Sequence, residues 1–225
     1  MGKLLNETME IYPAKYTDKH GEFETTIRND WKNLRMTVRG VEFSGSSFDG
    51  LYPEKDSIIS ELETFTFAQE CLCDCKISYE MPIEIITGDK VIIGNLAVQI
   101  ELGEPNEKGW TEQDDIVLNL SYEGKTFRSD GKSQWFEDEL LDIQKQLPEN
   151  HYLKYCFGCD FSDYSIYGHG FFGSMLCYKN IKEEYKKVTD KDEFMEIMDK
   201  SIEDVQETYL CPEFEVRKPG RGYRG

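Results

Sequence analysis

The sequence predicts an α+β fold, with a mostly antiparallel β-sheet or sandwich over the first 130 residues and two or three helices in the C-terminal half. Alternating apolar and polar residues recur before residue 130, and helix-period spacing appears only after it. The chain has 225 residues and is 39% hydrophobic, so a core can form without cross-links. We find no clean linker and no internal repeat, and therefore expect a single domain over residues 1–225.

The β-rich part contains strand patterns separated by turn residues. Leu34, Met36 and Val38 alternate with polar neighbours, the period of two that is expected of a strand with one buried face. Gly88 and Gly124 mark tight turns between such patterns. We expect strands at Glu22–Arg28, Leu34–Phe43, Glu63–Gln69, Cys71–Ile83, Val91–Leu102, Ile116–Tyr122 and Lys125–Phe127.

Helix signals follow in the C-terminal half. Ser133 is the expected N-cap of a first helix, and Pro148 is its expected stop. Asp190 and Glu193 match a capping box at the start of a second helix. We expect helices at Trp135–Leu147, at Asp190–Glu207 and, over a shorter length, at Asn180–Lys187.

The net charge of −18 limits the classes of function that the protein can have. A field of this sign repels phosphate backbones, so nucleic-acid binding is disfavoured, and it attracts a basic protein partner. The alternative is that the charge serves solubility alone. No apolar run approaches the ~20 residues of a membrane helix, and the first residues lack a secretory signal, so we expect a cytoplasmic protein without a membrane partner.

Two cysteine pairs predict a structural zinc site. Cys73 and Cys75 form a Cys-x-Cys pair whose side chains share one face of a strand, about 6.6 Å apart. Cys156 and Cys159 form a Cys-x-x-Cys turn with a glycine inside. Four thiolates fill the tetrahedral shell of Zn²⁺ and leave no open position, so such a zinc would stabilise the fold rather than catalyse.

Other interpretations of the cysteines stay open. Free cysteines also pack as small buried hydrophobes. Cys71 shares the face of the first pair and could replace one of its members, and Cys211 is either a spare ligand or a packed thiol. Cys177 has the surroundings of a core residue. A redox role for the Cys-x-x-Cys pair is less favoured, because the residues after Cys159 read as a loop rather than a helix.

An aromatic and glycine-rich segment, Tyr152–Tyr178, contains the second cysteine pair. Within it, Asp163–Gly170 combines polar side chains with a histidine between two glycines, a composition typical of binding loops. His169 is the best candidate for an acid or base, with Asp163 beside it. A nucleophilic set of Cys177, His169 and Asp163 can be formulated, although nothing in the spacing brings the three together. A packed loop over a sheet edge is the structural alternative.

The last nine residues carry four positive charges and no acid. Such a tail either lies back on the acidic surface of its own chain or engages an acidic partner.

Several runs of the sequence are distinctive when taken together. They include the Cys-x-Cys and Cys-x-x-Cys pairs, Ser-Asp-Tyr-Ser-x-Tyr-Gly-His-Gly from Ser162 and Glu-Thr-Tyr-Leu-Cys-Pro-Glu-Phe from Glu207. With these runs the chain resembles a bacterial, chiefly actinobacterial, family of uncharacterised proteins known only as a domain of unknown function. The resemblance implies a single bacterial cytoplasmic domain whose family pattern includes the four paired cysteines, with Cys71 as an addition. It implies no activity.

No phosphate-binding loop, dinucleotide fingerprint or hydrolase motif occurs in the sequence. We therefore expect a non-enzymatic interaction protein, an immunity- or antitoxin-like module whose acidic surface binds a basic effector and whose zinc rigidifies the fold. The alternative is an enzyme of unknown reaction that uses the Asp163–Gly170 loop with His169. A zinc-dependent nucleic-acid binder would require Arg28, Arg35, Arg39 and the basic tail to form one stripe.

Overall fold

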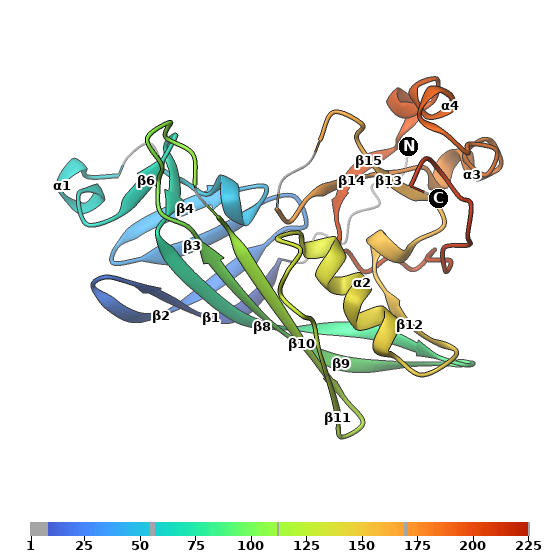
Figure 1. Ribbon diagram of the computed structural model, residues 1–225, viewed down its shortest axis with the longest axis horizontal. Coiled ribbons are helices and arrows are strands. Elements are labelled where there is room, and N and C mark those ends of the chain that lie inside the picture. Colours follow the sequence, from blue (N-terminus) through green and yellow to red (C-terminus); the bar gives the residue numbers. More distant parts are fainter. Residues whose placement is uncertain (1–8, 55–56, 112, 169–170, 225) are drawn as a thin grey trace.

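One large antiparallel sheet forms the body of the molecule (Figure 1). The computed structural model describes residues 9–54, 57–111, 113–168 and 171–224. Within them, ten strands join in the order β11-β10-β9-β8-β1-β2-β3-β4-β5, with β12 paired to β8. The strands are β1 Glu10–Asp18, β2 Gly21–Asn29, β3 Leu34–Val38, β4 Val41–Gly45, β5 Tyr52–Pro53, β8 Cys75–Thr87, β9 Lys90–Leu102, β10 Asp115–Tyr122, β11 Lys125–Arg128 and β12 His151–Lys154.

Smaller elements surround this sheet. A two-stranded sheet pairs β6 with β7, and a three-stranded sheet has the order β13-β14-β15. In Figure 1 the three-stranded sheet lies beside α3 and α4, at the end of the molecule away from α1 and β6. The bounds are β6 Thr66–Ala68, β7 Cys71–Cys73, β13 Ser162–Tyr164, β14 Ser174–Cys177, β15 Glu203–Gln206, α1 Ile59–Leu62, α2 Phe136–Gln146, α3 Lys182–Tyr185, α4 Lys191–Met195, and the 3₁₀ turns η1 Phe48–Gly50, η2 Cys156–Gly158, η3 Lys179–Ile181 and η4 Met198–Lys200.

The α+β class and the antiparallel sheet agree with the prediction. The long hairpin of β8 and β9 keeps one register from Cys75 opposite Leu102 to Thr87 opposite Lys90, with the turn at Gly88 as expected. Alternate residues of these strands are buried, as the period of two requires. The main hydrophobic cluster runs from Tyr12 on β1 to Cys211, and α2 packs against β10 over it.

Two expected strands are each divided in the structure, the first into a hairpin and the second into two separate strands. Leu34–Phe43 divides into β3 and β4, because Arg39 and Gly40 both adopt positive φ, 49° and 87°, and form a tight turn. Cys71–Ile83 is interrupted at Asp74, whose φ of 53° separates β7 from β8. Strand periodicity passes unchanged through a two-residue turn, which explains both errors.

The first predicted helix is confirmed as α2, although its N-cap is Trp135 rather than Ser133. The Ser133 hydroxyl donates instead to Glu139 Oε1 at 2.8 Å. The second predicted helix, Asp190–Glu207, is wrong beyond its first turn. Asp190 caps α4 by accepting the Glu193 amide at 2.9 Å, but α4 ends at Met195.

The residues that follow α4 form η4 and then β15, which pairs with β14. Val205 lies opposite Met175, and both side chains are buried. The apolar spacing that indicates a helix over this stretch thus serves a strand, because pairing with β14 outweighs local propensity.

The C-terminal segment, residues 215–224, lies back on the chain. The amide of Asp160 donates to Glu215 O, and the amide of Arg217 donates to Gly158 O, each at 2.8 Å. Further along, the Arg221 side chain donates to Lys186 O at 2.7 Å, and the Gly222 amide donates to Val188 O at 3.1 Å. Of the two dispositions expected for the basic tail, this is the intramolecular one.

Gly222 is required where the segment passes Asp163. Its φ is +62°, and a Cβ there would lie 2.2 Å from Asp163 Oδ2 and 2.4 Å from the Tyr185 hydroxyl. Gly220 has a similar φ of +74°, but a Cβ there would have no neighbouring atom within 4 Å. Substitution of Gly220 therefore tests backbone strain alone, and substitution of Gly222 tests backbone strain together with a steric clash.

We predict that Gly220→Ala lowers the free energy of unfolding by about 1–2 kcal/mol, the cost of a left-handed L-residue. Gly222→Ala should lower it by that amount plus roughly 2 kcal/mol more, because a buried contact must also open. Urea denaturation of the two variants measures the difference. Equal losses would show that the contact with Asp163 does not hold the segment.

Candidate functional site

The side chain of Asp163 is fully buried and bound by the C-terminal segment. Arg224 Nε lies 2.5 Å from its Oδ1, and the Tyr185 hydroxyl and Arg217 Nη2 lie 3.0 and 3.5 Å from its Oδ2. Because these donors surround the carboxylate, Asp163 anchors the segment rather than acting as a free base. His169 and Gly170 lie outside the described residues.

The nucleophilic set of Cys177, His169 and Asp163 is not supported by the strand register. Cys177 on β14 lies opposite Ser162 on β13, whereas Asp163 lies opposite Leu176. Neighbouring residues of a strand project to opposite faces of the sheet. The Cys177 and Asp163 side chains therefore point to different faces.

The structure does not bring the two predicted cysteine pairs together. Cys75 begins β8, whereas Lys154 pairs with Glu84, nine residues further along that strand. Nine residues of strand span ~30 Å, and Cys156 is only two residues beyond Lys154, so the pairs stay at least ~20 Å apart. Within the described residues, no group of three or more His, Cys, Asp or Glu is close enough to hold a metal as it stands.

Cys156 and Cys159 lie instead near Cys177 and Cys211. Cys156 interacts electrostatically with all three, and Cys159 interacts with Cys211. All four are buried. Burial raises the pKa of the Cys177 thiol to about 11 and that of the Cys156 thiol well above its ordinary value. Thiols held neutral in this way are poor nucleophiles, which disfavours the redox interpretation.

A pocket of about 570 Å³ lies between α2, β12 and the C-terminal segment. Its apolar surface comes largely from aromatic side chains that the aromatic-rich segment and β12 supply. Acids line it from α2, and basic residues line it from the C-terminal segment. The aromatic residues are Tyr152, Tyr155, Phe157 and Tyr164, the acids are Glu137 and Asp138, and the basic residues are Arg217, Lys218 and Arg224.

Arg224 links this pocket to Asp163. Its guanidinium lies 4.6 Å from the centre of the Phe157 ring and 5.3 Å from that of Tyr164, within the range of cation–π attraction. It also donates from Nη2 to Ser162 O at 3.0 Å. One side chain thus holds the segment, orders two aromatic rings and contributes to the pocket wall.

A buried carboxyl lies behind the Tyr164 hydroxyl. Tyr164 donates to Glu207 Oε1, and Glu207 is fully buried. Burial, with a smaller contribution from the charge of Glu137, raises the pKa of Glu207 well above its usual 4.5. Glu207 therefore keeps its proton to a higher pH than an exposed glutamate does. Tyr164 lines the pocket and joins it to the buried Glu207 carboxyl, and such a pair of groups can relay or hold protons.

Sequence reasoning does not find Glu207, Glu137 or Arg224 as site residues. Glu207 lies in the helix wrongly expected over Asp190–Glu207, and Glu137 looks like an ordinary first-turn acid of α2. The basic tail is the sequence feature that signals this site, since its arginines supply one wall of the pocket.

A family profile matches residues 10–162, and its description is a family of unknown function, DUF6304. This match covers more than half of the chain. The chain belongs to DUF6304. The matched part contains the large sheet, α2 and the cysteine pairs, and it ends before Tyr164, Glu207 and the C-terminal wall of the pocket. A bacterial, chiefly actinobacterial, origin of the family stays a prediction.

No curated protein and no solved structure matches the chain. No helix in the described part of the chain is both long and apolar enough to cross a membrane.

The raised pKa of Glu207 predicts a pH dependence of stability. Its folded pKa lies above the unfolded value, so its stabilising contribution is complete below about pH 4.5 and falls as pH rises toward the folded pKa. Glu207→Gln keeps the hydrogen-bond acceptor for Tyr164 and removes the titration. The variant should gain stability relative to the natural protein as pH rises above 4.5, by up to about 1.4 kcal/mol per pH unit.

Denaturant unfolding at pH 5, 6, 7 and 8 measures this difference. Glu123→Gln, in the exposed turn between β10 and β11, is the control and should keep the natural pH slope. A constant difference between Glu207→Gln and the natural protein across this range would contradict a raised pKa of Glu207.

Proposed function

We propose that the chain binds a small zwitterion with an apolar body in the pocket between α2, β12 and the C-terminal segment. The observation that carries this proposal is the arrangement of charge around aromatic rings. Glu137 and Asp138 line the pocket from α2, Lys218 and Arg224 line it from the C-terminal segment, and tyrosines lie among them. A largely apolar concave pocket with a few convergent polar groups is the usual form of a small-molecule site.

The basic wall is held in place without using the Lys218 ammonium. The Lys218 backbone amide donates to Asp160 Oδ1 at 3.0 Å, so its side chain is not needed to fix the segment. Arg224 is positioned by Asp163 and by two aromatic rings. A ligand carboxylate would interact with these cations, and a ligand ammonium with the acids of α2, while Tyr155 and Phe157 contact the apolar body.

L-Phenylalanine is a suitable probe, with 3-phenylpropionate and phenethylamine as matched compounds that lack the ammonium and the carboxylate. We predict that the zwitterion raises the midpoint of thermal unfolding more than either relative, because only it satisfies both charged walls. At 100 times its Kd, a ligand stabilises the fold by about 2.7 kcal/mol. The measurement is a thermal-shift titration with calorimetry.

Matched variants test the walls separately. Lys218→Met should weaken L-phenylalanine binding about tenfold, the effect of losing ~1.4 kcal/mol. It should also reduce the preference over phenethylamine. Lys125→Met, on exposed β11, is the control. Equal shifts with all three compounds, or none with any, would contradict the proposal.

The enzyme alternative uses the same pocket. Glu207, whose pKa is raised by burial, accepts a hydrogen bond from the pocket tyrosine Tyr164, and this favours the enzyme alternative because the pair could deliver a proton to a bound molecule. Tyr164 belongs to the Asp163–Gly170 stretch in which the sequence places a candidate site. Conversion of a bound ligand, lost in Tyr164→Phe while binding persists, would separate an enzyme from a binding protein.

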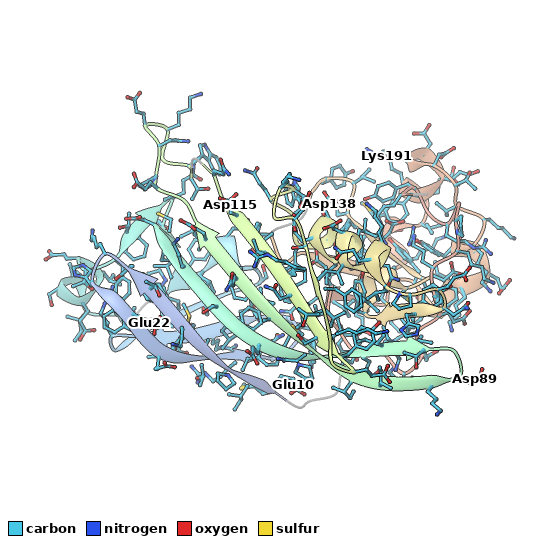
Figure 2. The ribbon with its side chains drawn as sticks, turned by 60° about the horizontal axis from the view of Figure 1, so that its bottom comes forward. Glu10, Glu22, Asp89, Asp115, Asp138 and Lys191 are labelled. Atoms are coloured by element: carbon cyan, nitrogen blue, oxygen red, sulfur yellow. The ribbon has the colours of Figure 1, made fainter. Side chains whose placement is uncertain are left out.

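A second proposal is the interaction module, in which the acidic surface binds a basic effector. Support comes from charge. The last nine residues carry 4 of the 26 basic residues and no acid, so the rest of the chain has 22 bases against 44 acids, a net charge of −22. Figure 2 shows acids on separate elements, among them Glu10 on β1, Asp115 on β10 and Asp138 on α2. This spread marks no single docking patch, so the proposal rests on net charge.

A nucleic-acid role lacks the basic stripe that it requires. Each of the three arginines proposed for the stripe is engaged by an acid. Arg28 pairs with Glu42, Arg35 with Asp30 at 2.9 Å and Arg39 with Asp18 at 2.8 Å. The tail arginines contact Asp160 and Asp163 in the same way.

A further inference from the structure

Four cysteines from three separate parts of the chain converge beside β13. Cys156 begins η2 and Cys159 directly follows it, and the amide of Cys159 donates to Cys156 O at 3.0 Å and closes a tight turn. Cys177 ends β14 and lies opposite Ser162 of β13. The Ser162 hydroxyl donates to the carbonyl of Cys156, and the carbonyl oxygen of Cys159 lies 3.4 Å from the same hydroxyl oxygen. The turn and the end of β14 are therefore neighbours.

Cys211 is brought to the same place by two backbone hydrogen bonds. The Phe157 amide donates to Glu207 O at 3.2 Å, and the Asp160 amide donates to Glu215 O at 2.8 Å. The segment between Glu207 and Glu215 thus begins and ends against the Cys-x-x-Cys turn, and Cys211 is its central residue.

We propose that Cys156, Cys159, Cys177 and Cys211 together bind one structural Zn²⁺. A Cys-x-x-Cys turn with two further cysteines from other segments is a common zinc framework, and four thiolates complete the tetrahedral shell. The ion fastens the turn, β14 and the segment after β15 at one point. Each ligand enters as a thiolate, so binding releases the thiol protons to solvent.

The sulfur atoms need a modest rearrangement to reach one ion, because in the ligand-free arrangement no such group of described residues is close enough to hold a metal. The proposal requires that side-chain rotation supplies this movement. Changing a cysteine from one χ1 rotamer to the next moves its sulfur by on the order of 3 Å. The backbone keeps its position, which is fixed by the turn, by the β13–β14 register and by the two backbone hydrogen bonds on either side of Cys211.

The surroundings suit thiolate ligands. The backbone amides of Phe161 and Glu215 point at the sulfur of Cys159, and that of Lys179 points at the sulfur of Cys177. Two of these donors lie two residues after the cysteine, so a tight turn supplies them locally. Donors of this kind orient the ligands of a metal and support their charge.

A buried lysine interacts with three of the four cysteines. Four thiolates and Zn²⁺ carry a net charge of −2. The Lys179 ammonium interacts electrostatically with Cys156, Cys177 and Cys211. Its side chain is 7% exposed and forms an ion pair with Glu203 at 2.9 Å.

The competing interpretation is four packed thiols without a metal, since cysteine is a common small core residue. Convergence of three chain segments, amides directed at the sulfurs and an adjacent buried ammonium are features that packing alone does not require. Cys73, at the end of β7, and Cys75, at the start of β8, lie far from the Cys-x-x-Cys turn, so they are excluded as ligands of this ion and serve as internal controls.

The test uses the full chain, purified without chelator and then loaded with zinc. We expect about one zinc per chain by elemental analysis. Co²⁺ in place of zinc should give the intense thiolate charge-transfer and d–d bands of a tetrahedral four-sulfur site. Cys211→Ser and Cys177→Ser should lose most of the metal, whereas Cys73→Ser and Cys75→Ser should keep it.

Variants at a buried site can fail to fold, so the natural protein provides a second readout. Alkylation by N-ethylmaleimide under native conditions, followed by peptide mass spectrometry, compares zinc-loaded and chelator-treated protein. Zinc should protect Cys156, Cys159, Cys177 and Cys211, and leave the labelling of Cys71, Cys73 and Cys75 unchanged. Absence of metal binding, a site with fewer than four sulfurs, or protection centred on Cys73 and Cys75 would overturn the proposal.

Discussion

The ion pairs of Asp163 with Arg224 and Arg217 position most of what gives the C-terminal half its chemical character. Asp163 is fully buried, so its charge must be compensated inside the molecule. Both compensating arginines come from the C-terminal segment. That segment supplies the basic wall of the pocket and closes against the Cys-x-x-Cys turn through Glu215 and Arg217. Pocket, cysteine cluster and segment are therefore mechanically coupled through one carboxylate.

Much of the large sheet is predictable because its strands alternate in burial. The β8–β9 and β10–β11 hairpins follow from apolar alternation joined to glycine-containing turns. Helix α2 follows from its spacing and from Pro148. The errors occur where local patterns are ambiguous. The turn at Arg39–Gly40 keeps the strand period on both sides, and the residues of β15 carry helix-period apolar spacing that only the presence of β14 reassigns.

The candidate site is less predictable, because its chemistry depends on contacts between distant segments. Cys156 and Cys159 are recognisable from spacing, but the choice between Cys73 and Cys211 as their neighbours depends on strand register, which a single sequence does not contain. Asp163 looks like part of a binding loop until the arginines of the C-terminal segment are placed around it. The pKa of Glu207 is raised chiefly by burial, which only the folded chain provides.

The two ends of the large sheet have a consequence for the molecule in concentrated solution. The main strand order ends at β11 and at β5, and the outer backbone groups of such edge strands recruit strands from neighbouring copies in other proteins. Here one edge, β11, has four residues and carries Lys125 and Arg128. The opposite edge, β5, has two residues and ends in Pro53, which has no N–H to donate. Short, charged and proline-blocked edges disfavour strand addition, so a sheet of this size can persist without seeding aggregation.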